Sequence, residues 1–511
     1  MLKLKFLLMI FPLLCNLLFA QKSLDSLMYS YQQKFWSEKE YVFVQGKLCD
    51  SFSNELNNVY EDWKKNPNFI VKYEDQLDST DLSKHLNFWG PIKSYKYLDK
   101  YLPSALTLTG NGFKLGSYLF NDSLDAISII SSGGNRRFQL GNFFEGTKTL
   151  WTTFQDISQY FVMQNYAITH HGFLNANKFD EERNYNVAAL RNKQLKKYET
   201  KYYTFSYDPQ IFSKNQNADS LFLFEDTKLD DVIKRLHFAY PERKIECYLY
   251  KDLEQKYCMS ATPGFGNPFP KAFQNHSIGF GPAEHESIHV LFGNASTIFS
   301  EGIVGYYYST KDSVEWKRTK STVSRHPDFS MKNFLNNSNN FDFSQLSYAA
   351  SAHFAKYLID TYGLEKFKSA ASFEDMSKGF RENYNKSLDE IVEGWNAYFQ
   401  NNKVELGAER EIVFKVIANT IPDTSSIYIV GDNVLIGMWD AGSIKLIKQN
   451  DGSWTRKFIF AEGTILNYKI TRGSWDTEAL DEKGNVPPNS VLEVKGNEMI
   501  VINVKKWKDL N

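Results

Sequence analysis

The chain has 511 residues, 42% of them hydrophobic and 23% charged, which is the composition of a globular protein and excludes a disordered chain. At roughly 150 residues per domain, this length predicts about three domains. The formal net charge is -1, which gives no electrostatic field to attract a polyanion, so we expect no nucleic-acid partner.

The first twenty residues have the pattern of a targeting segment. Lys3 and Lys5 precede an almost wholly apolar run from Phe6 to Phe19, and Ala20 closes it. This pattern predicts a secretory signal peptide over residues 1–20 and an exported protein, secreted, periplasmic or at the cell surface. The run is shorter than the ~20 residues that span a bilayer, and no later segment is apolar enough, so we expect no membrane span.

Three cysteines follow the signal peptide, Cys49, Cys247 and Cys258. So low a count indicates that disulfides do not build the fold. A bridge between Cys247 and Cys258 and a pair of free thiols both stay open.

Residues 21–140 are predicted to form a small α/β domain, to which we assign no function. A helix is expected over Phe52–Trp63, because its apolar residues recur at helical spacing. The strands expected here are Tyr41–Gln45, Phe69–Tyr73, Leu86–Trp89, Leu106–Leu108, Tyr118–Phe120 and Ala126–Ile130. Residues 141–195 are expected to be a helical connector.

From about residue 196 the pattern changes to strand, helix, strand. Strands are predicted over Tyr202–Tyr207 and Lys244–Tyr250. Between them, Asp226 is expected to cap a helix that places Leu229, Val232, Ile233 and Leu236 on one face. Asn275–Phe280 is expected to be an edge strand that leads directly into a cluster of metal-ligand residue types.

That cluster begins with His285, Glu286 and His289, spaced as H-E-x-x-H. On a helix, positions i and i+4 lie on one face, so the two imidazoles can share one Zn²⁺ while Glu286 lies beside a bound water. A catalytic zinc site needs a third protein ligand and an open position. Glu301, twelve positions after His289 on a second predicted helix, is the expected third ligand.

These residues resemble a known family. H-E-x-x-H, followed by Glu301-Gly302-x-x-x-Tyr306 and a later helix that contains Tyr348, resembles the glutamate-zincin metallopeptidases, peptidase MA-like domains related to aminopeptidase N. The resemblance implies a zinc metallopeptidase-like domain over residues 196–400, acting on a peptide or protein substrate, with Glu286 as general base and Tyr348 as oxyanion stabiliser. For Tyr348, a place in the hydrophobic core is an equally open reading. The spacer before Glu301 is shorter than in the family, and Ala350-Ser351 replaces its Lys-Gly.

Short strands with Gly and Asp turns in residues 410–511 predict an all-β sandwich. Motifs such as Gly437-Met438-Trp439-Asp440 and Arg472-Gly473-Ser474-Trp475 resemble carbohydrate-binding module family 20, the starch-binding domains. The resemblance implies that Trp439, Lys469, Trp475 and Asn489 bind a starch-like glucan or another glycan, with indole rings stacking on sugar faces. A sandwich that lost its sugar site is the alternative.

The sequence therefore predicts an α+β multidomain protein, with an N-terminal α/β unit, a zincin-like domain of sheet plus helices, and a C-terminal β-sandwich. Its expected function is that of a secreted zinc-dependent metallopeptidase, which cleaves peptide bonds by a metal-activated water and carries a glucan-binding tail. One alternative is a non-catalytic carbohydrate-binding protein on a peptidase-like scaffold, and another is a metallopeptidase with a purely structural tail. Retention of the base Glu286 favours a catalyst.

Overall fold

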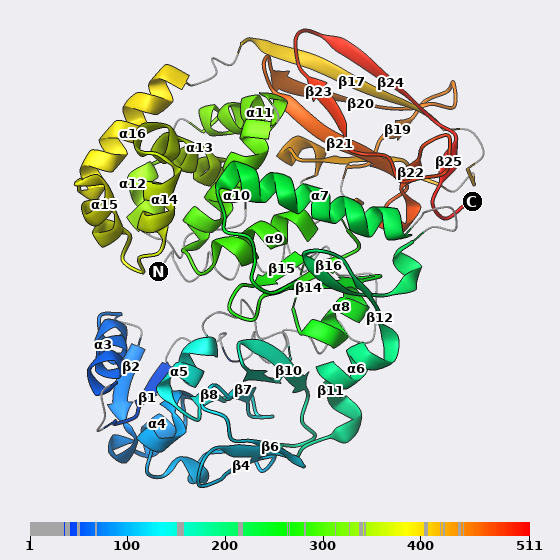
Figure 1. Cartoon of the computed structure of the whole chain (residues 1–511). Coiled ribbons are helices and arrows are strands. Elements are labelled where there is room, and N and C mark those ends of the chain that lie inside the picture. The colour runs from blue at the N-terminus through cyan, green and yellow to red at the C-terminus, as the bar shows by residue number, and fades with distance from the viewer. Residues whose placement is uncertain are drawn as a thin grey trace. The chain divides into compact units, whose positions relative to one another are not determined.

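The computed structural model describes residues 35, 41–48, 52–66, 69–150, 158–212, 218–262, 264, 266–280, 283–311, 313–326, 328–336, 341, 344–402, 407–418, 421–422, 425–437, 441–442 and 444–510. The described residues fall into two compact units, one within Ala20–Gly293 and the other within Asn294–Asn511. Figure 1 labels the helices and strands of both units. The predicted signal peptide and Cys49 lie outside the described residues.

An eight-stranded sheet forms the first part of the N-terminal unit, in the order β11-β10-β9-β7-β8-β3-β1-β2. Strands β2, β1, β3 and β8 run parallel, and the others are antiparallel. Its first members are β1 (Tyr41–Gln45), β2 (Phe69–Tyr73), β3 (His85–Pro91), β7 (Ala126–Ile130) and β8 (Arg136–Gly141), with helices α3 (Ser53–Lys64) and α4 (Ser79–Leu82) and the small sheet of β4 (Leu106–Leu108), β5 (Phe113–Leu115) and β6 (Tyr118–Phe120). All the strands and the helix predicted here are confirmed.

The sheet does not end near residue 140. After α5 (Phe144–Thr149) it continues with β9 (Tyr160–Gln164), β10 (Ala167–Gly172) and β11 (Asn184–Asn186), before α6 (Val187–Gln194). The helical connector expected over 141–195 is therefore corrected in its middle part. Strand β9 is buried on both faces apart from its last residue, so it lacks the alternation that marks a half-exposed strand.

A second sheet of five strands completes this unit, in the order β12-β13-β14-β16-β15. The strands are β12 (Lys196–Glu199), β13 (Tyr203–Tyr207), β14 (Ile245–Tyr250), β15 (Gly266–Phe269) and β16 (Gln274–Ile278), and the helices are α7 (Ala218–Leu236), α8 (Leu253–Ser260) and α9 (Ala283–Phe292). Strand β16 lies between β14 and β15, so the expectation of an edge strand there is wrong, because the edge is β15.

Asp226 does not begin a helix. Helix α7 starts at Ala218, and the Asp226 carboxylate accepts hydrogen bonds from Thr200 Oγ1 (2.8 Å) and from the backbone N–H groups of Lys201 (2.9 Å) and Tyr202 (3.1 Å). The same acceptor chemistry that suits a cap here ties the helix to the turn before β13. The predicted apolar face of this helix is buried.

Helices make up the first part of the second unit: α10 (Thr297–Lys311), α11 (Ser313–Ser324), α12 (Met331–Asn336), α13 (Gln345–Tyr362), α14 (Leu364–Ala371), α15 (Met376–Tyr384) and α16 (Leu388–Asn402). Helix α10 packs closely on α13 through glycine. A Cβ built on Gly305 would lie 2.4 Å from the Ala352 Cβ, and one built on Gly302 would lie 2.9 Å from the Ser351 carbonyl oxygen.

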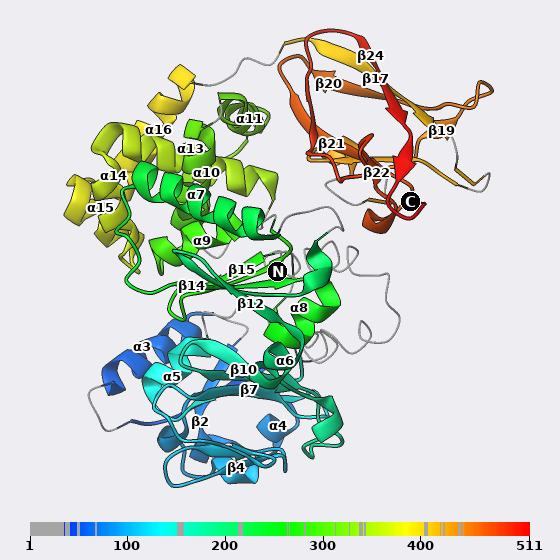
Figure 2. The ribbon, with the colours of Figure 1, turned by 45° about the vertical axis from the view of Figure 1, so that its right-hand side comes forward.

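The C-terminal module is a sandwich of two sheets, ordered β19-β20-β17-β24 and β18-β21-β23. Figure 2 shows β17, β20 and β24 along one side of this module and β21 along the other. The strands are β17 (Glu409–Ala418), β18 (Tyr428–Gly431), β19 (Ile447–Lys448), β20 (Trp454–Ala461), β21 (Ile465–Thr471), β22 (Ala479–Leu480), β23 (Ser490–Glu493), β24 (Glu498–Val504) and β25 (Lys506–Trp507). Phe414, Leu466 and Trp454 are among the buried side chains between the sheets. The predicted sandwich is confirmed.

The chain is thus a mixed α/β multidomain protein with a C-terminal β-sheet module. The zincin-like fold expected for residues 196–400 stays a prediction. Cys247 and Cys258 are both free thiols, so the bridge left open by the sequence does not form. Among the described residues, no helix is both long and apolar enough to cross a bilayer.

Candidate functional site

Helix α9 carries the two predicted histidine ligands on one face. The Nε2 atoms of His285 and His289 lie 3.0 Å apart. The helix is fixed to its sheet through Ser287, whose hydroxyl donates to the Ala283 carbonyl oxygen (2.7 Å) and accepts from Tyr203 OH (3.0 Å) and Asn275 Nδ2 (3.2 Å). These buried hydrogen bonds hold the imidazole-bearing face in a set orientation.

The third predicted ligand lies close to this pair. One ligand atom from each of His285, His289 and Glu301 lies within 4.8 Å of the other two. Two imidazole nitrogens and one carboxylate oxygen form a donor set that suits Zn²⁺ and leaves one coordination position open. The chemistry of these residues therefore fits the predicted ion.

Glu286 is 7% exposed and lies against strand β15. A Cβ built on Gly266 would lie 2.2 Å from Glu286 Oε1, so a larger residue at position 266 would displace this carboxylate. The fully buried Lys256 ammonium donates to the Thr262 carbonyl oxygen (3.2 Å), to Thr262 Oγ1 (2.9 Å) and to Asn267 Oδ1. Asn267 follows Gly266 on β15. Burial lowers the pKa of Lys256 to about 7, and the negative charge of Glu286 partly offsets this effect.

Tyr348, the predicted oxyanion stabiliser, lies in the first turn of α13. Its side chain is 38% exposed, and its ring meets Phe341 edge-on at 5.2 Å. The alternative reading as a core aromatic is therefore wrong. The catalytic roles of Tyr348 and Glu286 stay predictions.

Three of the four predicted sugar-binding residues are described, and Trp439 lies outside the described residues. Lys469 lies on β21, Trp475 in the short 3-10 turn η9 (Trp475–Thr477), and Asn489 just before β23. Lys469 Nζ donates to the Glu478 carboxylate and to the Pro487 carbonyl oxygen (2.9 Å). Glu478 follows Trp475 by three residues, and Pro487 precedes Asn489 by two. Lys469 therefore connects the two segments that carry Trp475 and Asn489.

The turn that carries Trp475 is built on Thr477. The Thr477 hydroxyl oxygen accepts from the backbone N–H groups of Arg472 (3.2 Å) and Ser474 (3.1 Å), and the Thr477 N–H donates to the Ser474 carbonyl oxygen (3.1 Å). The Trp475 indole is partly buried. A partly exposed indole on a rigid turn is suited to stacking on a sugar ring.

The sequence did not single out Glu478 and Pro487. Glu478 is 5% exposed, and a buried carboxylate needs a cation. Strand alternation was the signal in the sequence that could have indicated this pair. Lys469 follows the buried Tyr468 on β21, and the chain that returns antiparallel to β21 brings Glu478 within reach of it.

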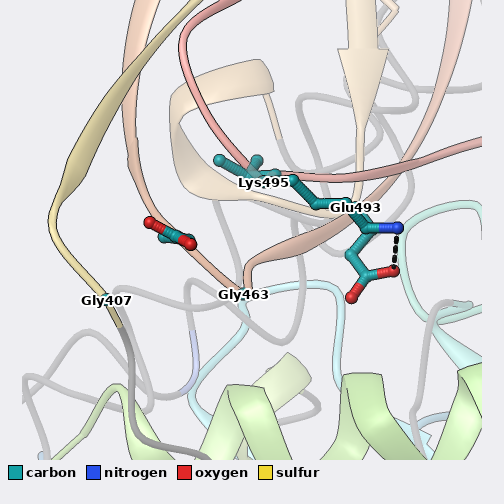
Figure 3. A pocket seen from close by; sticks show the side chains of 6 residues that line it. Gly407, Gly463, Glu493 and Lys495 are labelled. Carbon is teal, nitrogen blue, oxygen red and sulfur yellow. Dashed lines mark ion pairs between the residues drawn. The ribbon is translucent and has the colours of Figure 1, made fainter.

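A hollow of about 250 Å³ is also present in this module. Figure 3 shows its lining, which comes from Gly407, Glu462, Gly463, Glu493, Val494 and Lys495. Lys495 Nζ lies 3.3 Å from a Glu493 carboxylate oxygen. None of these described lining residues carries an aromatic ring, so they offer no surface on which a sugar ring can stack.

Residues 409–498 match the starch binding domain family. The C-terminal module is therefore a starch-binding domain, as the sequence predicted. Two amylopullulanases are similar to part of the chain: that of Thermoanaerobacterium thermosulfurigenes is 26% identical over 171 residues (30% of this chain, 9% of the relative), and that of Thermoanaerobacter thermohydrosulfuricus is 32% identical over 110 residues (19% and 7%). An alpha-amylase of Niallia circulans is 24% identical over 102 residues (19% and 8%). The chain thus spans less than a tenth of the length of these curated relatives.

Several solved structures are also similar to parts of the chain. The γ-CGTase of alkalophilic Bacillus clarkii is 17% identical, with 19% of this chain and 15% of that chain covered and a TM-score of 0.14. The family 15 glucoamylase of Hypocrea jecorina is 12% identical, with 44% and 46% covered and a TM-score of 0.16.

These relatives correct the predicted activity. They are amylopullulanases and an alpha-amylase, with no peptidase among them, so the assignment as a zinc metallopeptidase with a peptide substrate is wrong. The physical reason is that a five-residue histidine–glutamate motif identifies a metal-ligand geometry and says nothing of the bond that is broken.

Proposed function

We propose that this protein is carbohydrate-active and acts on starch-like α-glucan, which it binds through residues 409–498. The observation that carries the proposal is the starch-binding domain in that range. The names of the relatives, amylopullulanase and alpha-amylase, support the same substrate class. Export, predicted from residues 1–20, is part of the proposal.

The geometry of the module supports this function. Glucan is uncharged, so binding has to rest on stacking and on hydrogen bonds to hydroxyl groups. Trp475 supplies a ring on a rigid turn, and the Lys469 ammonium supplies a donor that its bond to Glu478 ties to the end of that turn. Asn489 is exposed on the loop that Lys469 holds through the Pro487 carbonyl oxygen.

The test is co-sedimentation of the full chain with starch granules. We expect the wild-type protein to bind and Trp475→Ala to lose most of its binding. Tyr240→Ala is the matched control, because Tyr240 is a 54% exposed aromatic outside this module. Failure of the wild-type protein to bind starch granules and soluble amylose would refute the proposal.

A second proposal concerns the metal-ligand cluster, and the donor set of His285, His289 and Glu301 favours it. We propose that these residues bind Zn²⁺, which when bound supplies Lewis-acid polarisation of a substrate oxygen. In this proposal Glu286 accepts a proton from water, and the Tyr348 phenol donates a hydrogen bond to the glycosidic oxygen on which negative charge develops. The substrate in this proposal is the glucan held by the module.

Metal content separates this proposal from the first. We expect about one zinc per wild-type chain by elemental analysis, and less than about a tenth of that for His289→Ala, since two ligands hold zinc poorly. His237→Ala is the control, because His237 lies outside the cluster. Reducing-end release from soluble starch that disappears in Glu286→Gln would support catalysis at this centre, whereas unchanged release in that variant would refute it.

A further inference from the structure

Lys469 occupies a central position in the starch-binding module. Along β21, Leu466, Tyr468 and Ile470 point into the core between the two sheets. Strand alternation therefore places Lys469 on the opposite face. Its side chain is 14% exposed, so this ammonium is largely withdrawn from bulk water.

The carboxylate of Glu478 compensates the charge of Lys469. Its side chain is 7% exposed, and the two side chains form an ion pair. The backbone brings them together, because the chain returns after the Trp475 turn and Thr471 and Glu478 form an antiparallel bridge. The Lys508 N–H donates to the Glu478 carbonyl oxygen (3.0 Å) and fixes the far side of this residue.

A lysine ammonium has three N–H donors. One is directed to Glu478 and one to the Pro487 carbonyl oxygen, and the third has no acceptor among the described residues. The first two contacts fix the direction of the third. They also attach the Trp475 turn and the loop before Asn489 to one atom.

We propose that Glu478 is the positioning residue of the glucan-binding face. Through its ion pair it fixes the Lys469 ammonium, so that one N–H is directed to a sugar hydroxyl and the two loops that carry Trp475 and Asn489 keep their spacing. Glu478 also neutralises the Lys469 charge and thereby selects uncharged glucan over anionic glycans. This inference rests on the proposed function of the module.

The selectivity follows from the burial of the pair. A lone, mostly buried ammonium would attract a sulfated or phosphorylated sugar, because Coulomb attraction is strong where water is excluded. With Glu478 in place, an anionic sugar meets a carboxylate as well as the ammonium. An uncharged hydroxyl loses nothing from that carboxylate and gains a charge-assisted hydrogen bond from Lys469.

The test uses the full chain with Glu478→Gln and isothermal titration with maltoheptaose and with sulfated maltoheptaose. Glutamine keeps the shape and an acceptor oxygen but removes the charge. We expect maltoheptaose binding to weaken about tenfold, because a held donor becomes mobile, and the affinity for the sulfated sugar to increase. The matched control is Glu482→Gln, whose ion pair with Lys505 (2.8 Å) is exposed to solvent, and it should change neither affinity.

A double variant, Lys469→Met with Glu478→Gln, separates positioning from folding. Removing both partners of a buried pair is tolerated far better than removing one. We therefore expect its thermal midpoint to return toward the wild-type value while maltoheptaose binding stays weak. This variant carries the test if Glu478→Gln alone does not fold.

Two results would overturn the inference: Glu478→Gln with the wild-type preference between the two sugars, or a double variant that binds maltoheptaose like the wild-type protein. Failure of the wild-type protein itself to bind maltoheptaose would refute the proposed function instead. The two proposals therefore fail in distinguishable ways.

Discussion

Substitution of Gly305 by alanine tests how α10, the helix that carries Glu301, is held in place. The new Cβ would lie 2.4 Å from the Ala352 Cβ and 3.2 Å from its Cα. Neither atom is the end of a flexible side chain, so α10 has to move away from α13. Overpacking of this kind costs about 1–3 kcal/mol.

An opposing effect comes from helix propensity, since alanine favours a helix interior by about 1 kcal/mol over glycine. The severity of the contact puts the overpacking cost near its upper end, so we expect a net destabilisation of about 1–2 kcal/mol. The shift also displaces the Glu301 carboxylate, four residues earlier on the same helix, and should weaken zinc binding.

Native-state hydrogen exchange of peptides from residues 297–311 measures this loss locally. Gly305→Ala should lower their free energy of opening, whereas the control Gly496→Ala should not lower protection anywhere, because nothing lies within 4 Å of a Cβ at that position. Unchanged or increased protection of α10 in Gly305→Ala would refute the reasoning that close glycine packing positions Glu301.

The other predictions concern stability. Burial lowers the pKa of His171 to about 4, below the 6.5 of the unfolded chain, so the unfolded state binds more protons in acid. The free energy of unfolding of the N-terminal unit should therefore fall by up to about 3 kcal/mol between pH 7 and pH 4. Urea titrations should show a smaller fall over this pH range for His171→Gln. Phe414→Ala removes a fully buried ring from the sandwich core, so it should lower the free energy of unfolding of that module by about 3–5 kcal/mol, measured by calorimetry. A loss no larger than that caused by an alanine substitution at an exposed position would contradict the packing. Arg410→Ala breaks a solvent-accessible pair with Glu462 and should cost less than about 1 kcal/mol by the same calorimetry.

The sequence predicted those parts of the fold in which one local pattern decides the outcome. The helix at Ser53–Lys64 and the strands of the sandwich were read from spacing alone, because one face of each packs against a core. The motif at His285 and His289 likewise predicted two imidazoles on one helical face, and their nitrogens lie 3.0 Å apart.

Long-range pairing could not be predicted in the same way. Asp226 was expected to cap a helix, but it binds backbone N–H groups in the turn before β13, and a carboxylate suits either role. Strand β16 is interior because β15, a strand containing proline, pairs with it, and no pattern in β16 itself reveals that neighbour. Glu478 was missed because it lies in the segment between η9 and β22, outside any regular strand whose alternation would align it with Lys469 on β21.

Hydrogen exchange of the full chain with saturating maltoheptaose tests the central claim most directly. We expect slower exchange in residues 465–478 and 487–490, where Lys469, Trp475 and Asn489 lie, and no change with a β-linked glucan of equal length. Protection confined to other parts of the chain, or equal protection by the β-linked sugar, would contradict it.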